Sequence, residues 1–418
     1  MTFAFLARAT GVLALLFLCA LPAYAGPVRP NALDARASAL ATQQLLSAPA
    51  ATLVDPDRQI AAARYVRWRI PGFLLTFLVP IGLLTYFWRS GLAAALRDRM
   101  RARLAEFGVR FCMGAIVAAI AWIAALLPQF YLYRIERIMG ISPQIWPSWA
   151  LDWLGTFAVA VVATGVVAAV VLWLADRTHQ WYLYTMLAVV VGEVLYAYVA
   201  PASVAPRYHD FRAPRAAIAA RLQALETKAA VSGVPIVVAD RSRQSPTDDA
   251  FVVGAGPSQR IVLTDSLVRA GTPGEIAFLT ARAIEHVVDE DQVRRALVAA
   301  LLVIIGMALA VTLADRVGFR RDDDPVSRLA LVGALLGCTY LVALPVYQSY
   351  LRSGEGRVDM AAVALTGDRA SAVRAMIRRA DERLEPLCPN TLTMLYFQRT
   401  PPIAVRVAAF NGTPANCR

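Results

Sequence analysis

The sequence predicts a mainly α-helical, polytopic membrane protein with a small α+β domain outside the bilayer. Of its 418 residues, 58% are hydrophobic and 17% are charged, whereas soluble domains average about 45–50% and about 25%. Mean hydropathy is +0.52, and the apolar residues fall in long charge-free runs between polar stretches. This composition excludes a disordered chain, a disulfide scaffold and an ordinary cytosolic enzyme.

Six apolar runs are each close to the ~20 residues that a membrane-spanning helix needs. They lie at 70–88, 111–133, 153–175, 181–200, 296–314 and 329–347. Glu193 alone interrupts the run 181–200. An ionisable residue inside a span is a candidate functional residue, although a hydrated cavity or a nearby arginine would also accommodate it. A transport or proton-relay function would rest on Glu193 alone.

The N-terminal residues 1–25 have the pattern of a secretory signal peptide. Arg8 precedes an apolar stretch at 12–21, and Ala23-Tyr24-Ala25 supplies a small-x-small cleavage site. An uncleaved first helix is the alternative. Residues 26–69 are polar to amphipathic and are predicted to lie outside the membrane.

The formal net charge of +12 reflects arginine, because all but one of the 42 basic residues are arginines and Lys228 is the exception. We do not expect a nucleic-acid partner, since many of these arginines flank apolar runs and so set membrane orientation. The short loops 89–110 and 315–328 carry the strongest positive-inside signal. They predict a bacterial inner-membrane protein in which 201–295 and 348–418 share the periplasmic side.

The chain is therefore expected to fold in six parts around the lipid bilayer. These are a signal peptide (1–25), an extramembrane N-terminal segment (26–69), four transmembrane helices (70–200), the first part of an extramembrane domain (201–295), two transmembrane helices (296–347) and the C-terminal part of that domain (348–418). Cys388 and Cys417 share the last part. An oxidising compartment would allow them to pair, but their spacing alone does not establish the bond.

The polar stretch after the fourth span has the pattern of an α+β unit. A helix is predicted at 216–230, and β-branched runs typical of strands lie at 236–239, 250–253 and 261–264. A second helix is predicted from Pro273 to about Val288. Thr272 can cap it, Pro273 suits its first position, and Glu275 can return the capping-box hydrogen bond.

The order of motifs along this unit resembles the membrane zinc metallopeptidases of the CAAX prenyl protease 1 and HtpX type. The matching residues are Asp249-Ala250-Phe251, Gly254, Ile261-Val262-Leu263, Asp265 and Leu267, then Glu275-Ile276, and further on Glu355, Val358 and Asp359, Leu365-Thr366-Gly367-Asp368, and Pro401-Pro402 followed by Arg406. The resemblance covers roughly residues 70–410. It implies a metallopeptidase-like domain whose helix from Pro273 should carry the zinc motif HExxH.

This sequence departs from the family at that motif. In HExxH, two histidines on one helix face bind zinc, and the glutamate activates the metal-bound water. Here the five positions read Arg282-Ala283-Ile284-Glu285-His286. Arg282 stands at the first ligand position, and a guanidinium has no lone pair to offer a metal. Ala283 stands at the general-base position, so only His286 is retained.

The other family positions are only partly conserved. Glu355 stands at the third ligand position, Asp359 closes the E-x-x-A-D pattern, and Arg406 matches the tail arginine, whereas Thr400 replaces a histidine and Asp249 an asparagine. A catalytic zinc usually has three protein ligands. His286 and Glu355 are therefore remnant metal positions, and we expect no cofactor unless a divergent zinc site exists.

Arg282 suggests how a site without zinc could remain stable. If Glu355 and Asp359 approach the helix face of Arg282, its guanidinium can replace the missing positive charge through a bidentate pair. The competing interpretation is that these residues are ordinary surface charges.

The sequence thus favours a pseudoprotease: a membrane protein with a metallopeptidase fold that binds extended polypeptides or envelope proteins without cutting them. The alternative is an active zinc metalloendopeptidase, a hydrolase with a divergent metal site. The transporter-like hypothesis built on Glu193 is weaker still.

Overall fold

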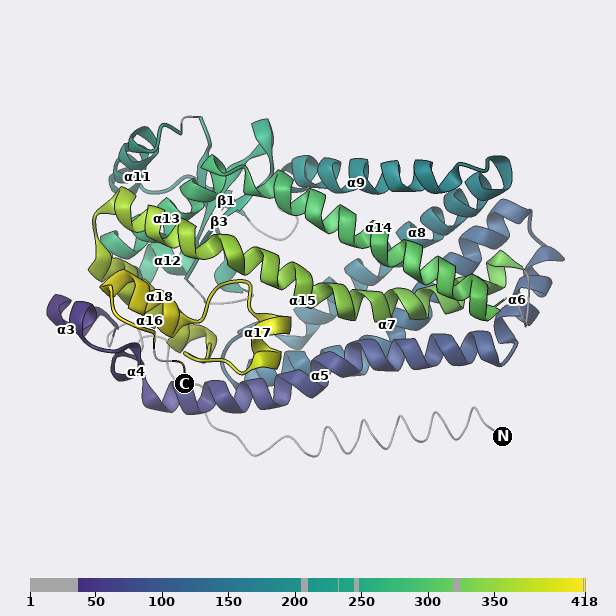
Figure 1. The fold of residues 1–418 in the computed structure, drawn as a ribbon, viewed down its shortest axis with the longest axis horizontal. Coiled ribbons are helices and arrows are strands. Elements are labelled where there is room, and N and C mark those ends of the chain that lie inside the picture. Colours follow the sequence, from purple (N-terminus) through teal and green to yellow (C-terminus); the bar gives the residue numbers. More distant parts are fainter. Residues whose placement is uncertain are drawn as a thin grey trace.

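The computed structural model describes residues 37–203, 210–231, 233–243, 248–318, 324–415 and 417. The signal peptide predicted at 1–25 lies outside the described residues, and so does His209, one of the three histidines of the sequence. The fold is mainly α-helical, with a long helical bundle that ends at one side in a small α+β domain (Figure 1).

Six helices in the described part of the chain are long and apolar enough to cross a membrane. They are α5 (Pro56–Arg89), α7 (Glu106–Ile138), α8 (Trp146–Arg177), α9 (Trp181–Ser203), α14 (Asp291–Gly318) and α15 (Pro325–Thr366). Each contains one of the six predicted apolar runs. Helix α15 has 42 residues, and it continues beyond its apolar part into the α+β domain (Figure 1).

The two arginine-rich loops meet at the end of the bundle that lies away from the α+β domain. The short helix α6 (Leu92–Arg101) joins α5 to α7 there (Figure 1). Arg101 Nη1 lies 2.5 Å from Asp324 Oδ2, and Arg97 Nη1 lies 3.6 Å from the same oxygen. These contacts place both loops on one side of the bundle, as the positive-inside pattern predicts.

The α+β domain is built on a four-stranded sheet with the order β1-β2-β4-β3. Its strands are β1 (Phe211–Arg212), β2 (Ile236–Ala239), β3 (Ala250–Val253) and β4 (Arg260–Thr264). Strands β2 and β4 are parallel, while β3 pairs with β4 antiparallel and leaves its other side as a sheet edge. The three strands predicted from β-branched runs are confirmed within one residue.

Helices from two parts of the chain surround the sheet. They are α11 (Ala216–Lys228), α12 (Asp265–Ala270), α13 (Pro273–Val288), α16 (Arg369–Arg383), α17 (Thr391–Phe397) and α18 (Ile403–Asn411). Helix α13 begins and ends where the sequence predicts. Thr272 Oγ1 accepts the Glu275 N–H at 3.3 Å, and Glu275 Oε2 accepts the Thr272 N–H at 2.7 Å, so the capping box is formed.

A third segment of the chain, which sequence patterns did not reveal, also belongs to this domain. Helices α3 (Thr42–Ser47) and α4 (Ala50–Leu53) pack on α16 and α18. Leu45 and Leu53 are buried in the same hydrophobic core as α13, and Asn411 Nδ2 donates to Leu45 O at 3.0 Å. The segment before the first span is thus a structural part of the domain.

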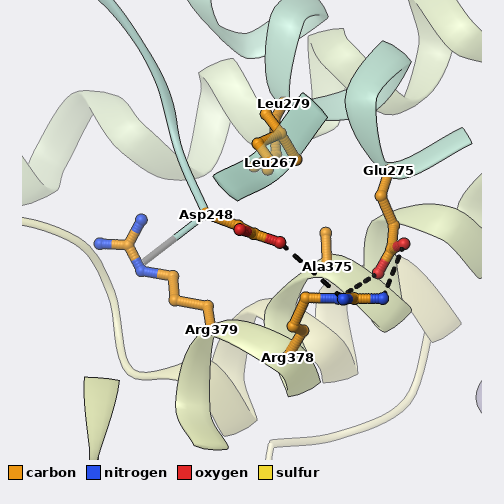
Figure 2. A pocket seen from close by; sticks show the side chains of 7 residues that line it. All are labelled: Asp248, Leu267, Glu275, Leu279, Ala375, Arg378 and Arg379. Carbon is orange, nitrogen blue, oxygen red and sulfur yellow. Dashed lines mark hydrogen bonds and ion pairs between the residues drawn. The ribbon is translucent and has the colours of Figure 1, made fainter. Parts of the chain in front are cut away.

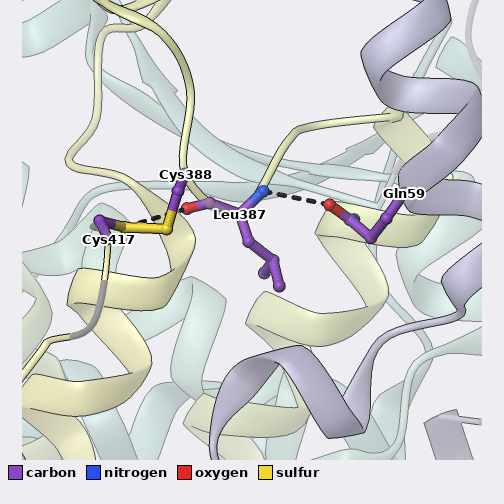
Figure 3. Close-up of a disulfide and its surroundings, with 4 residues drawn as sticks. All are labelled: Gln59, Leu387, Cys388 and Cys417. Atoms are coloured by element: carbon purple, nitrogen blue, oxygen red, sulfur yellow. Dashed lines mark hydrogen bonds between the residues drawn. A yellow bond between two sulfur atoms is a disulfide. The ribbon is translucent and has the colours of Figure 1, made fainter.

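Cys388 and Cys417 form a disulfide in the described structure, which resolves the pairing that spacing left open. The bond links the loop after α16 to the C-terminal end of the chain (Figure 3). Next to it, Leu387 N donates to Gln59 Oε1 of α5 at 3.2 Å. The C-terminus, the loop after α16 and the first turns of α5 are therefore fastened together.

Candidate functional site

Helix α13 places Arg282 and His286 on one face, as i and i+4 residues of a helix must lie. Both point toward α15, which packs along α13. The Arg282 side chain is 5% exposed, and Ala283 is completely buried. The first three residues of the motif, Arg282 to Ile284, are thus buried in the domain, and Glu285 and His286 are partly buried.

Arg282 bridges two carboxylates of α15. Its Nη2 donates to Glu355 Oε2 at 2.5 Å, and its Nε donates to Asp359 Oδ1 at 2.6 Å. The pairing predicted from the sequence is therefore present, and it includes both carboxylates rather than one. Their side chains are 8% and 3% exposed, which rules out ordinary surface charges.

Asp359 is held by a second guanidinium from α18. Arg406 Nε donates to Asp359 Oδ2 at 2.6 Å, and its Nη2 donates to Asp359 Oδ1 at 2.8 Å. This bidentate geometry, with two nearly parallel hydrogen bonds, is the strong and directional form of an arginine–carboxylate pair. Arg406 is 2% exposed, so the tail arginine belongs to the centre of the site.

His286 is paired with carboxylates on both ring nitrogens. Its Nδ1 lies 2.6 Å from Asp291 Oδ2, and its Nε2 lies 3.5 Å from Glu355 Oε1. Arg295 Nη2 lies 3.2 Å from each of these two acids. Burial alone would favour neutral imidazole, but the hydrogen bonds to Asp291 and Glu355 outweigh it and raise the pKa of His286.

The charges around Arg282 stabilise its protonated state. Burial opposes the charged form, but Asp359 and Glu355 outweigh this cost and raise the pKa of Arg282 further. A buried carboxylate without a partner would be costly. Arg282, Arg406, Arg295 and His286 therefore act as the counter-charges of an acidic pocket, which is the role a metal cation would otherwise have.

The charged side chains around Arg282 form a cluster, which extends to the edge strand through Asp249. This residue directly precedes β3. Arg383 Nη2 donates to Asp249 Oδ2 at 2.7 Å, and Arg379 Nη1 lies 3.9 Å from Oδ1. Burial opposes ionisation, but Arg383 and Arg379 together lower the pKa of Asp249. The family asparagine is thus replaced by an anion that two arginines of α16 neutralise.

A separate buried pair fixes the start of α13. Arg378 Nε donates to Glu275 Oε1 at 3.0 Å, and Arg378 Nη1 lies 3.9 Å from Asp248 Oδ2. Figure 2 shows these three side chains meeting beside a cavity of about 10 Å³, while Arg379 points away to the other side of Asp248. The cavity is the size of one water molecule, so this pair is structural.

Sequence reasoning missed several members of the cluster. Arg295 and Asp291 lie at the start of α14, where they form an i, i+4 ion pair. Their spacing was visible in the sequence, but only the tertiary approach of α14 to α13 brings them to His286. Glu193 lies on α9, half-buried, without a described contact to the cluster, and His179 is exposed.

The donor set does not fit a catalytic zinc ion. Of the three family ligand positions only His286 and Glu355 carry metal-binding side chains, and Arg282 Nη2 occupies one oxygen of Glu355. Within the described residues no group of three or more His, Cys, Asp or Glu side chains is arranged to hold a metal. A third ligand and the general base would both have to come from elsewhere.

Comparison with known proteins defines the class of the molecule. The sequence model of the five-helix CAAX prenyl protease N-terminal region matches residues 40–209, and that of peptidase family M48 matches residues 212–413. Together they cover almost the whole described chain. The protein therefore belongs to the membrane metallopeptidase family of the CAAX prenyl protease and HtpX type.

Individual relatives support this assignment. The "Uncharacterized metalloprotease YhfN" of Bacillus subtilis (strain 168) is 22% identical over 375 residues, which cover 85% of this chain and 86% of the relative. "Protease HtpX homolog 1" of Streptomyces coelicolor is 29% identical over 145 residues, covering 34% and 47%. The crystal structure of S. mikatae Ste24p superposes with a TM-score of 0.74 at 17% identity, covering 91% and 96% of the two chains, which shows the shared fold.

Proposed function

We propose that this protein is a catalytically inactive member of its family that binds extended polypeptides at the membrane surface. The observation that carries the proposal is the bridge from Arg282 to Glu355 and Asp359. A permanently charged guanidinium there neutralises the carboxylates that would face zinc, and it cannot act as a metal ligand.

The chemistry of hydrolysis also lacks its base. In the family mechanism a carboxylate next to the first histidine takes the proton of the attacking water. Ala283 offers only a methyl group at that position, and it is completely buried. Thr400, at the place of the family histidine, is 8% exposed. A proton acceptor within hydrogen-bond reach is a requirement for general-base catalysis.

The edge of the sheet at β3, which Asp249 directly precedes, offers what polypeptide binding requires. Thr264 N donates to Asp249 O at 3.0 Å, so residues 249, 251 and 253 bond to β4 and the alternate residues direct their backbone groups to the open edge. Val252 therefore presents its N–H and C=O to that edge. An extended chain can add there as a further strand, which supplies affinity without any cleavage.

The proposal places the α+β domain on the periplasmic side of a bacterial inner membrane. The arginine-rich loops lie together at the opposite end of the bundle, where positive charge favours the cytoplasm. The Cys388–Cys417 disulfide joins the loop after α16, a helix of this domain, to the C-terminal residues, and disulfides persist in oxidising compartments.

Incubation of the purified full-length protein with a fluorescent, unfolded polypeptide tests this function. Binding measured by anisotropy without any fragments on a gel is the expected result. Val252→Pro should weaken binding, because proline removes the edge N–H without removing a bond to β4. Fragments that disappear when a zinc chelator is added would refute the proposal.

The second candidate is an active metalloendopeptidase with a divergent zinc site. Two observations favour it: His286 and Glu355 keep family ligand types, and the relative from Bacillus subtilis is named a metalloprotease. It requires Arg282 to leave both carboxylates, although its side chain is 5% exposed. The chelator arm of the same experiment separates the two candidates.

A further inference from the structure

The end of the bundle away from the α+β domain carries positive charge that the acidic side chains described there do not balance. Its described carboxylates are already occupied. Asp98 and Asp324 pair with Arg97 and Arg101, Glu106 with Arg101 and Arg110, Asp176 with Arg110, and Asp315 with Arg328. No unpaired carboxylate is therefore described at this end for any further arginine, whose counter-charge would come from outside the described residues.

Three arginines of the α5–α6–α7 connection are in that position. Arg89 ends α5, Arg99 lies on α6, and Arg103 follows α6. All three are exposed, and none has an ion pair within the residues that the structure describes. We call this set the basic collar.

Apolar side chains accompany the basic collar. Leu92, Leu104 and Phe107 are 42%, 43% and 53% exposed. Leu92 and Arg99 are two helical turns apart, so they share one face of α6, whereas Ala93 and Arg97 are buried against the bundle. A short helix that exposes both arginines and leucines is typical of one lying in the membrane interface.

We propose that the basic collar binds the headgroups of anionic phospholipids. A guanidinium matches a phosphate through two parallel hydrogen bonds. The collar also lies at the ends of the apolar spans, the depth at which lipid phosphates lie. Leu92, Leu104 and Phe107 then contact the upper acyl chains, a contact that neither free phosphate nor a nucleic acid would use.

Native mass spectrometry of the full-length protein tests this assignment. The protein is purified in detergent with equal amounts of phosphatidylglycerol and phosphatidylcholine, and the retained lipids are counted. We expect a preference for phosphatidylglycerol of about fivefold or more, as surface arginines near anionic lipid provide. The variant Arg89→Gln/Arg99→Gln/Arg103→Gln should lose this preference.

Two matched variants separate a lipid site from bulk charge. Arg215→Gln/Arg221→Gln/Arg369→Gln removes three exposed arginines from the α+β domain and should leave the preference unchanged. Arg89→Lys/Arg99→Lys/Arg103→Lys keeps the charge and should retain most of the lipid preference. This variant remains informative if the glutamine variant does not fold.

Four results would overturn the proposal. The glutamine variant of the basic collar could fold and keep the full preference. The variant with three substitutions in the α+β domain could instead lose as much of the preference as the glutamine variant of the collar. Excess inorganic phosphate could also abolish it in the unchanged protein where sodium chloride of the same ionic strength does not, which would indicate a simple anion site. The preference should decline with added salt, because exposed charges are screened. A preference that does not change with salt and is equal in the lysine variant and the glutamine variant would contradict the proposal.

Discussion

Arg282 Nη2 lies 2.5 Å from Glu355 Oε2 and joins α13 to α15 where the family positions its zinc ligands. The same guanidinium reaches Asp359 through Nε. A cation is needed here because two buried carboxylates lie one turn apart on α15 and both face α13. In this chain the Arg282 guanidinium supplies a cation at that place, and under the proposed function it stands in for the zinc ion.

Removing that cation should destabilise the folded protein. Arg282→Met leaves Glu355 and Asp359 buried with fewer partners, which should lower the free energy of unfolding by about 3–5 kcal/mol. Arg357→Met is the control. Its ion pair with Asp289 also joins α15 to α13, but the Arg357 side chain is 67% exposed, so its loss should cost less than about 1 kcal/mol. Denaturant unfolding measures the free energy of unfolding of both variants. An equal loss of stability in the two would contradict the account.

Back-substitution should recreate a metal site. Arg282→His together with Ala283→Glu restores three ligands and the base, and we expect about one zinc per chain with chelator-sensitive peptidase activity. Arg282→His alone is the matched control, which should bind zinc without cleaving. Elemental analysis and a peptide-cleavage assay read the two properties separately. A folded double variant without zinc would show that this geometry no longer supports the family chemistry.

Asp249 should make the protein sensitive to acid. Because Arg383 and Arg379 lower its pKa, the native state binds the proton less readily than the unfolded chain. The resulting stability is fully present above the unfolded-state pKa of about 3.9 and is lost as the pH falls through the lower native value. Asp249→Asn should remove this part of the dependence. Melting temperatures from pH 7 downward would test it, and parallel curves for both proteins would contradict it.

The disulfide should stabilise the domain through the loop it closes. Cys388 and Cys417 are 29 residues apart, and cross-linking a loop of that length contributes about 3–4 kcal/mol in the chain-entropy model. Cys417→Ser should therefore lower the melting temperature clearly. Cys338→Ser changes an exposed free cysteine and should have little effect. Equal melting temperatures for Cys417→Ser and the unchanged protein would count against the bond in solution.

Sidedness can be measured in cells. A C-terminal tag should be removed by protease added to spheroplasts, because the proposal places the α+β domain outside. A tag inserted at Ser90, in the connection between α5 and α6, should stay protected until the membrane is opened. The reverse pattern would place the domain in the cytoplasm and would leave the disulfide without an oxidising compartment.

The hydropathy pattern predicted most of the fold. Spanning helices depend on local composition, so the six apolar runs could be read directly from the sequence. The continuation of α15 beyond its apolar run to Thr366 was not predicted. Local hydrogen bonding likewise determined the start of α13, where Thr272 and Glu275 form the capping box. The docking of α3 and α4 could not be predicted, because Leu45 meets Asn411 across 366 residues of sequence.

The candidate site was predicted in part for a similar reason. Arg282, Glu355 and Asp359 could be brought together from the family resemblance, which supplies the approach of α13 to α15. Arg295 and Asp291 have no family motif, and only the path of α14 past His286 reveals them. The resemblance therefore predicted the centre of the cluster, and the fold supplied its outer pairs.

Metal content is the most direct test of the central claim that Arg282 replaces the zinc ion. The full-length protein is purified without chelators, supplied with excess zinc, desalted and analysed by inductively coupled plasma mass spectrometry beside the His286→Ala variant. The account predicts far less than one zinc per chain in both, with no difference between them. About one zinc per chain that disappears in His286→Ala would contradict it, because a three-ligand site would then exist despite the guanidinium.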